Sequence, residues 1–134
     1  MMLNGALAGL VAITAEPLTP TPGLAIAIGS IGALIMYFGT KMLENFGIDD
    51  VVGAIPVHMF AGIFGTLVVP ISNNDTSFGT QLIGTLSVCV FSFVLSYLVF
   101  LSLKVTIGLR ISKAAEKLGT DKSEIGVTAY SIRD

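Results

Sequence analysis

The chain of 134 residues has little charge and few of the residues that build most metal and redox sites. Charged residues make up 12% of it and apolar residues 53%, whereas about a quarter of an average soluble protein is charged. One cysteine and one histidine exclude a disulfide framework and a zinc site of three or four Cys or His ligands. Seven basic and nine acidic residues give a net charge of −2. The sequence therefore does not have the excess of basic residues that nucleic-acid-binding proteins use to bind phosphates. No metal or cofactor is therefore expected.

The few charges are also unevenly distributed. Residues 17–40, 51–74 and 76–103 contain no Asp, Glu, Lys or Arg. About 20 apolar residues span a bilayer as a helix, and a soluble domain of this length has no interior for three such runs. The sequence therefore predicts an integral membrane protein, all-α, with a polytopic bundle of membrane helices.

Polar or proline-rich loops divide the apolar sequence into four segments. The predicted helices are residues 2–15, 22–43, 50–71 and 77–109, within a membrane region 1–110 that a polar tail, 111–134, follows. The first segment is short for a span, and we interpret it as the remaining part of a helix whose beginning is missing. In the tail, Ser112–Leu118 is predicted as a short helix that Gly119 ends.

The basic residues predict the orientation of the chain in the membrane. The loops at residues 16–23 and 72–75 contain no Lys or Arg. With four crossings, all seven basic residues fall on one side, and this side is cytoplasmic by the positive-inside rule. We therefore expect a multi-pass protein of the cell membrane with a cytoplasmic C-terminus. The basic residues are Lys41, Lys104, Arg110, Lys113, Lys117, Lys122 and Arg133.

The single histidine, His58, lies inside the third predicted helix, about 10 Å along this helix from Val51 and near the middle of the bilayer. An ionisable group in a span usually faces a protein interior or a pathway. A structural histidine that bonds a neighbouring helix is an equally weighted alternative. At 100° per residue, His58 shares its face with Val51, Ala54, Ala61, Gly62, Gly65 and Val69, whereas Phe60, Ile63 and Leu67 lie opposite.

Other residues have structural interpretations that compete with functional ones. Asp49 and Asp50 precede the third segment, where they form either an acidic vestibule or a helix cap, and capping is preferred for at least one. Small residues recur at a spacing that lets membrane helices approach closely. These are Gly5, Gly9, Ala25, Gly29 and Ala33.

Four stretches in order resemble the ammonium transporters of the Amt/Mep/Rh family, and they cover essentially the whole chain. The stretch 49–67 (DDVVGAIPVHMFAGIFGTL) resembles the family's penultimate membrane helix. The other stretches are 4–14 (NGALAGLVAIT), 80–84 (TQLIG), and 108–110 with the tail residues Gly119, Asp121, Glu124, Gly126, Ala129 and Tyr130. The resemblance implies the last four helices of an eleven-helix fold, and a longer parent protein.

The resemblance also implies roles for individual residues. His58 matches the second of two pore histidines, Ala54 the inner pore wall and Asp50 an acidic position at the cytoplasmic mouth, beside Asp49. Thr14 matches a threonine near the middle of the pore, although Ala15 replaces the usual proline, and Met59 replaces a frequent glycine.

The family further implies ammonium or ammonia as the substrate and a homotrimer as the assembly. It implies a tail that docks under the pore through Gly119 and Tyr130, with a PII-type regulator at the cytoplasmic face. A non-transporting membrane subunit or ammonium sensor remains the alternative. An intramembrane enzyme is disfavoured, because His58 has no evident catalytic partner.

Overall fold

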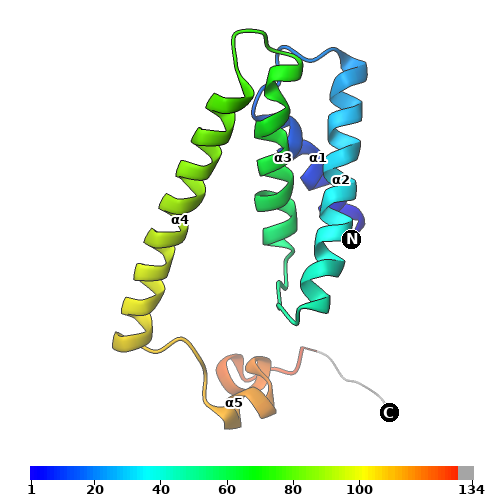
Figure 1. Cartoon of the computed structure of the whole chain (residues 1–134). Helices are drawn as coiled ribbons and strands as arrows, with labels where there is room; N and C mark the ends of the chain where they lie inside the picture. The colour runs from blue at the N-terminus through cyan, green and yellow to red at the C-terminus, as the bar shows by residue number, and fades with distance from the viewer. Residues whose placement is uncertain (130–134) are drawn as a thin grey trace. The chain divides into compact units, whose positions relative to one another are not determined.

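The computed structural model describes residues 1–129, and these residues are entirely helical or irregular, without a strand. The expected all-α class is thus observed for this part of the chain (Figure 1). The elements are α1 (Met2–Thr14), α2 (Pro22–Asn45), η1 (Ile55–Phe60), α3 (Ala61–Val68), η2 (Val69–Ile71), α4 (Phe78–Thr106), α5 (Lys113–Leu118) and η3 (Asp121–Ile125).

Two of the described helices, α2 and α4, are long and apolar enough to cross a membrane, whereas α1 and the stretch Ile55–Ile71 are shorter apolar helices. The chain divides into two compact units at residue 91, within α4. The first unit contains α1, α2 and the helical stretch η1–α3–η2, and the second contains the end of α4 and the tail.

Local sequence signals explain where the helices begin. Proline at the first position of α2 follows Thr21, whose hydroxyl accepts a hydrogen bond from the Leu24 N–H at 3.3 Å. The third helical stretch begins at about residue 54 instead of the predicted residue 50. The cause is a turn at Val51–Val52 followed by Gly53, which has a φ of +75°. Side-chain-bearing residues rarely adopt this backbone conformation, so the helix cannot start earlier.

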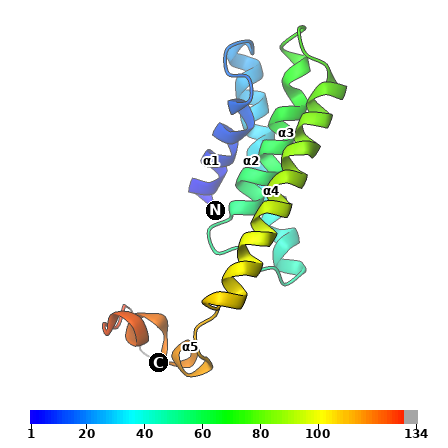
Figure 2. The same cartoon turned by 90° about the vertical axis from the view of Figure 1, so that its left-hand side faces the viewer.

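Helices α1, α2 and α3 pack together through small side chains, and Figures 1 and 2 show α1 alongside both of the others. The core of the first unit consists of Ala8, Met36, Val57 and Ala61, all buried, with Val11 packed against them. The predicted close approach of small residues is observed at two pairs: a Cβ placed on Gly9 would lie 3.1 Å from the carbonyl oxygen of Gly29, and one placed on Gly5 would lie 4.0 Å from the Ala33 Cβ. The three backbones therefore lie close enough for extensive van der Waals contact.

Ala12 of α1 lies between two glycines of the neighbouring helices. A Cβ on Gly32 would lie 2.6 Å from the Ala12 Cβ, and a Cβ on Gly65 would collide with the Ala12 carbonyl oxygen. Neither helix can accept a larger residue at these positions without moving away from α1.

Replacement of Gly65 by valine is therefore expected to destabilise the packing of α1 against α3 by about 1–3 kcal/mol or more, because the added carbons have no space. Thermal unfolding of the protein in detergent measures the effect. The matched control is Gly84→Val in α4, where nothing lies within 4 Å of an added Cβ. Equal stability of the two variants would contradict the close approach of α1 and α3.

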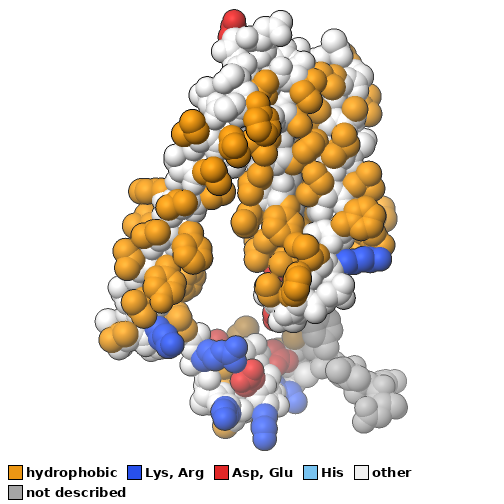
Figure 3. All heavy atoms as spheres, in the orientation of Figure 1, with side chains coloured by type: hydrophobic (Ala, Val, Ile, Leu, Met, Phe, Trp, Pro, Cys, Tyr) orange, Lys and Arg blue, Asp and Glu red, His pale blue; other side chains and the backbone are white. Residues whose placement is uncertain are grey.

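Helix α4 extends across the division at residue 91. None of its residues is buried and large apolar side chains are exposed along its length, which is typical of a helix that contacts lipid. Hydrophobic side chains also cover much of the first unit on the face drawn in Figure 3. In the tail, the Ser112 hydroxyl caps α5 by accepting a hydrogen bond from the Ala115 N–H at 3.1 Å, and Gly119 ends this helix, as predicted.

Candidate functional site

His58 lies in the middle of η1, a π-helical turn. The Ala61 N–H points to the Pro56 carbonyl oxygen, five residues earlier, as well as to that of His58. Proline at position 56 has no N–H to contribute to the helical pattern, and such turns frequently occur at functional sites. The sequence around His58 thus produces a local departure from α-helix at the single histidine of the sequence.

The side chain of His58 is exposed and takes no part in the packing of the three helices. The buried positions of this stretch are Pro56, Val57, Ala61, Gly65 and Val69, and the last four recur every four residues on the side that faces α1 and α2. His58 follows Val57 and is exposed together with Ala54. The chain's own packing leaves the imidazole free for another contact.

The predicted helix face is therefore wrong for the residues after His58, whereas Ala54 is exposed together with His58, as expected for a shared face. His58 does not share a buried face with Ala61 and Gly65, and Phe60, which was expected opposite, is half-buried and packs against Gly39. The prediction assumed 100° per residue, whereas a π-turn holds more residues per turn and rotates each of them less. As a result, Val57 and not His58 lies on the buried face that Ala61 and Gly65 continue.

Asp50 caps the beginning of this helical stretch. Its Oδ1 accepts a hydrogen bond from the Ala54 N–H at 2.9 Å and its Oδ2 accepts one from the Ile55 N–H at 2.7 Å. Asp49 is exposed. Both residues border a cavity of about 110 Å³ that α2 and the start of η1 complete. Its lining is Thr40, Leu43, Glu44, Ile48, Asp49, Asp50, Gly53 and Pro56.

Replacement of Asp50 by alanine is expected to destabilise the protein by about 0.5–2 kcal/mol, because two N–H groups at a helix start lose their acceptor. Asp49→Ala is the matched control and should remain within about 0.5 kcal/mol of the unaltered protein. Chemical unfolding in detergent compares the two. Equal losses would show that general negative charge, and not the cap, matters at this end of the helix.

Thr14 lies away from His58. It is the last residue of α1, it is exposed, and its hydroxyl donates a hydrogen bond to the Leu10 carbonyl oxygen at 2.6 Å. Ala8 packs in the cluster around Val57, whereas Ala12 meets Gly65. Thr14 therefore lies about two helical turns further along α3 than His58. The structure does not bring these two predicted residues together.

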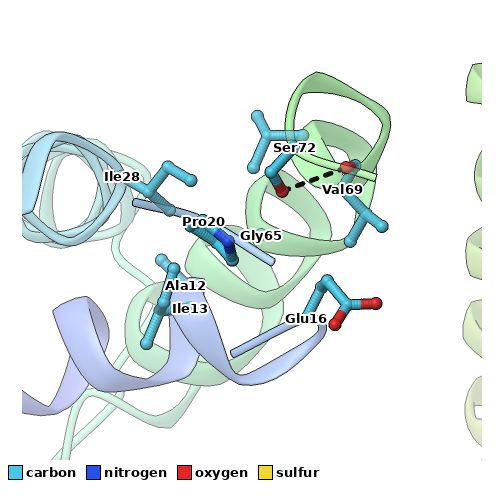
Figure 4. Close-up of a pocket in the computed structure, with 9 residues that line it drawn as sticks. Ala12, Ile13, Glu16, Pro20, Ile28, Gly65, Val69 and Ser72 are labelled. Carbon is cyan, nitrogen blue, oxygen red and sulfur yellow. Dashed lines mark hydrogen bonds between the residues drawn. The ribbon is translucent and has the colours of Figure 1, made fainter. Parts of the chain in front are cut away.

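Two hydrogen bonds that the sequence did not reveal join the loops at the far end of α1 and η2. Glu16 accepts one from Asn73 and Thr19 donates one to Ser72. Figure 4 shows Glu16 and Ser72 around a small cavity at this end. The predicted topology places both loops on the same side of the membrane. This shared side was the one sequence signal that the two loops could contact each other.

The tail residues form a compact turn around Asp121. Its Oδ2 accepts a hydrogen bond from the Ala129 N–H at 2.9 Å, and its backbone carbonyl accepts one from Val127 at 3.2 Å. The Ala129 N–H, followed by that of Lys122, holds the pKa of Asp121 below its ordinary value. Gly119 precedes this turn with a φ of +96°. Tyr130, the other predicted docking residue, lies outside the described residues.

Comparisons with known proteins agree with one another. The family model described as "Ammonium Transporter Family" matches residues 1–130. The chain is 37% identical over 151 residues to ammonium transporter Amt2 of Archaeoglobus fulgidus, covering 97% of the chain and 32% of that protein. It is 33% identical over 136 residues to ammonium transporter Amt1 of Methanocaldococcus jannaschii, covering 96% of the chain and 35% of that protein. The chain thus spans about a third of the length of these relatives.

Proposed function

The chain belongs to the ammonium transporter family, and we propose that it forms one wall of a path for ammonium or ammonia across a membrane. The match of the family model over residues 1–130 carries this proposal. The family consists of membrane channels and transporters and not of enzymes. The exposed apolar surface of α4 and the span-length helix α2 agree with a membrane location.

We propose His58 as the residue of this wall that contacts the passing solute. An ion at the centre of a bilayer is costly, whereas neutral ammonia is not, so a path through apolar walls favours the neutral form. Neutral imidazole has one donor and one acceptor nitrogen and can exchange a hydrogen bond with ammonia. The exposure of His58 on a π-turn, outside the packing of the three helices, supports this role.

The remaining site residues take positions along the same path in this proposal. Ala54, exposed one turn before His58, lines the path towards the cytoplasm, and Asp50 fixes this end of the helix by capping it. Asp49 adds negative charge beside the 110 Å³ cavity at the mouth. Thr14, about two turns away along α3, lines the other half of the path.

The proposed assembly is a homotrimer of eleven-helix subunits in which this chain supplies the last four helices. In this proposal the tail, which carries four of the seven basic residues, lies in the cytoplasm, in agreement with the positive-inside rule. There the turn after Gly119 docks under the path, and a PII-type regulator can meet it. The hydrogen bonds around Asp121 support a defined surface for such docking.

Uptake into vesicles tests the proposed function. The complete transporter that carries this sequence as its C-terminal part is expected to give saturable ammonium uptake, whereas this chain purified alone is expected to give none, because a single wall encloses no path. Saturable uptake by the chain alone would contradict the one-wall proposal. Ammonium binding by the complete protein without uptake would instead favour a sensor.

A further inference from the structure

The loops after α1 and after η2 are joined by two side-chain hydrogen bonds. The Asn73 Nδ2 donates to Glu16 Oε2 at 2.9 Å, and the Thr19 hydroxyl donates to the Ser72 hydroxyl at 3.1 Å. The partners are 57 and 53 residues apart in the sequence. These bonds are therefore tertiary contacts between the ends of two helical stretches and not local turns.

Asn73 is held in one orientation for this contact. Its Oδ1 accepts a hydrogen bond from the Asp75 N–H at 2.9 Å, which leaves the Nδ2 group directed to Glu16. Its backbone N–H donates to the Val69 carbonyl oxygen at 3.0 Å, so the residue continues directly from η2. Both Glu16 and Asn73 are half-buried, and a hydrogen bond to a carboxylate is stronger than one between neutral groups.

The space beneath these bonds is nearly filled. Figure 4 shows the cavity between the end of α1, Pro20, Ile28 of α2 and the end of the α3–η2 stretch, and its volume is about 10 Å³. Such a cavity holds about one water molecule at most. Movement of the end of α1 away from η2 would thus open a void and break the hydrogen bonds together.

Glu16 stands two residues after Thr14, and Asn73 stands at the end of the helical stretch that carries His58. We propose that Glu16 and Asn73 are positioning residues for transport: their hydrogen bond holds the end of α1 against η2 and so keeps Thr14 in register with the His58 helix. This inference rests on the proposed function, in which Thr14 and His58 line one path.

The complete transporter tests the inference with three variants. Asn73→Leu removes the donor to Glu16, together with the acceptor for the Asp75 N–H, and keeps the charge of Glu16. It is expected to lower the maximal rate of ammonium uptake severalfold at equal membrane abundance. The pair Glu16→Gln with Asn73→Asp reverses donor and acceptor, and it should restore the rate to within about twofold of the unaltered protein. Asn74→Leu, at an exposed neighbouring position, is the control and should transport normally.

Hydrogen exchange of the purified protein supplies a readout that does not depend on transport. Amides in the last turn of α1 should exchange faster in Asn73→Leu and regain their protection in the reversed pair. Uptake by Asn73→Leu equal to that of Asn74→Leu would overturn the inference. So would a reversed pair as slow as Asn73→Leu.

A charge role for Glu16 gives a different pattern. Glu16→Gln alone would then raise the ammonium concentration for half-maximal uptake while Asn73→Leu transports normally, and this result would also overturn the inference. Absence of uptake in the unaltered protein would refute the proposed function. Hydrogen exchange would then still decide whether the bond holds the end of α1, and unchanged exchange in Asn73→Leu would refute the hydrogen bond itself.

Discussion

Replacement of His58 by alanine in the complete transporter is expected to change the ammonium flux by about 5- to 150-fold, or to change the charge carried per ammonium. The range corresponds to the loss of one hydrogen bond of about 1–3 kcal/mol to the passing solute. Insertion and folding should remain intact, since His58 is exposed and outside the core of Ala8, Val57 and Ala61. Uptake and current in reconstituted vesicles measure both quantities.

Met59→Ala is the matched control for this experiment. Met59 follows His58 on the same π-turn and is 50% exposed, so its truncation removes volume without removing a hydrogen-bonding group. Flux and charge coupling should stay near those of the unaltered protein. If His58→Ala also left both quantities unchanged, His58 would be a structural residue and not a contact of the path.

Replacement of Gly119 by aspartate is expected to abolish transport without lowering the amount of protein in the membrane. Gly119 has a φ of +96°, and an added Cβ would lie 2.5 Å from the Oδ1 of Asp121. The carboxyl of Asp121 is charged at neutral pH, and the Ala129 N–H lowers its pKa further from the ordinary acidic value. A second carboxylate beside it therefore adds repulsion to crowding and backbone strain. The turn that holds Ala129 would therefore open.

Two further variants separate these causes. Gly119→Ala introduces the strain and the crowding without the charge, and its transport should be intermediate. Gly126→Asp introduces a carboxylate at a φ of +74° where nothing lies within 4 Å of the Cβ, and it should retain more transport than Gly119→Asp. Full flux in Gly119→Asp would show that the tail is only a solvated segment, without a docking role.

The helices were predictable because their signals are local. Runs without charge mark the apolar segments, the prolines between Pro17 and Pro22 separate α1 from α2, and Ser112 and Gly119 delimit α5. Each of these signals acts through backbone geometry or through the cost of placing charge in lipid, and neither depends on distant residues.

The details of the His58 helix were not predictable in the same way. Its late start depends on the positive φ of Gly53, and the face of His58 depends on the π-turn that Pro56 and Ala61 help to form. A helical wheel that assumes 100° per residue cannot represent a π-turn, in which each residue rotates less. The Glu16–Asn73 hydrogen bond joins residues far apart in sequence, and only the folded arrangement of α1 and η2 brings them together.

The central claim is that the protein conducts ammonium along a path that this chain helps to form, and uptake into vesicles that contain only the purified complete transporter tests it most directly. Uptake should saturate with ammonium concentration, exceed that of protein-free vesicles, and change in the His58→Ala variant. Folded, membrane-inserted protein whose vesicles take up ammonium no faster than protein-free vesicles would contradict the claim.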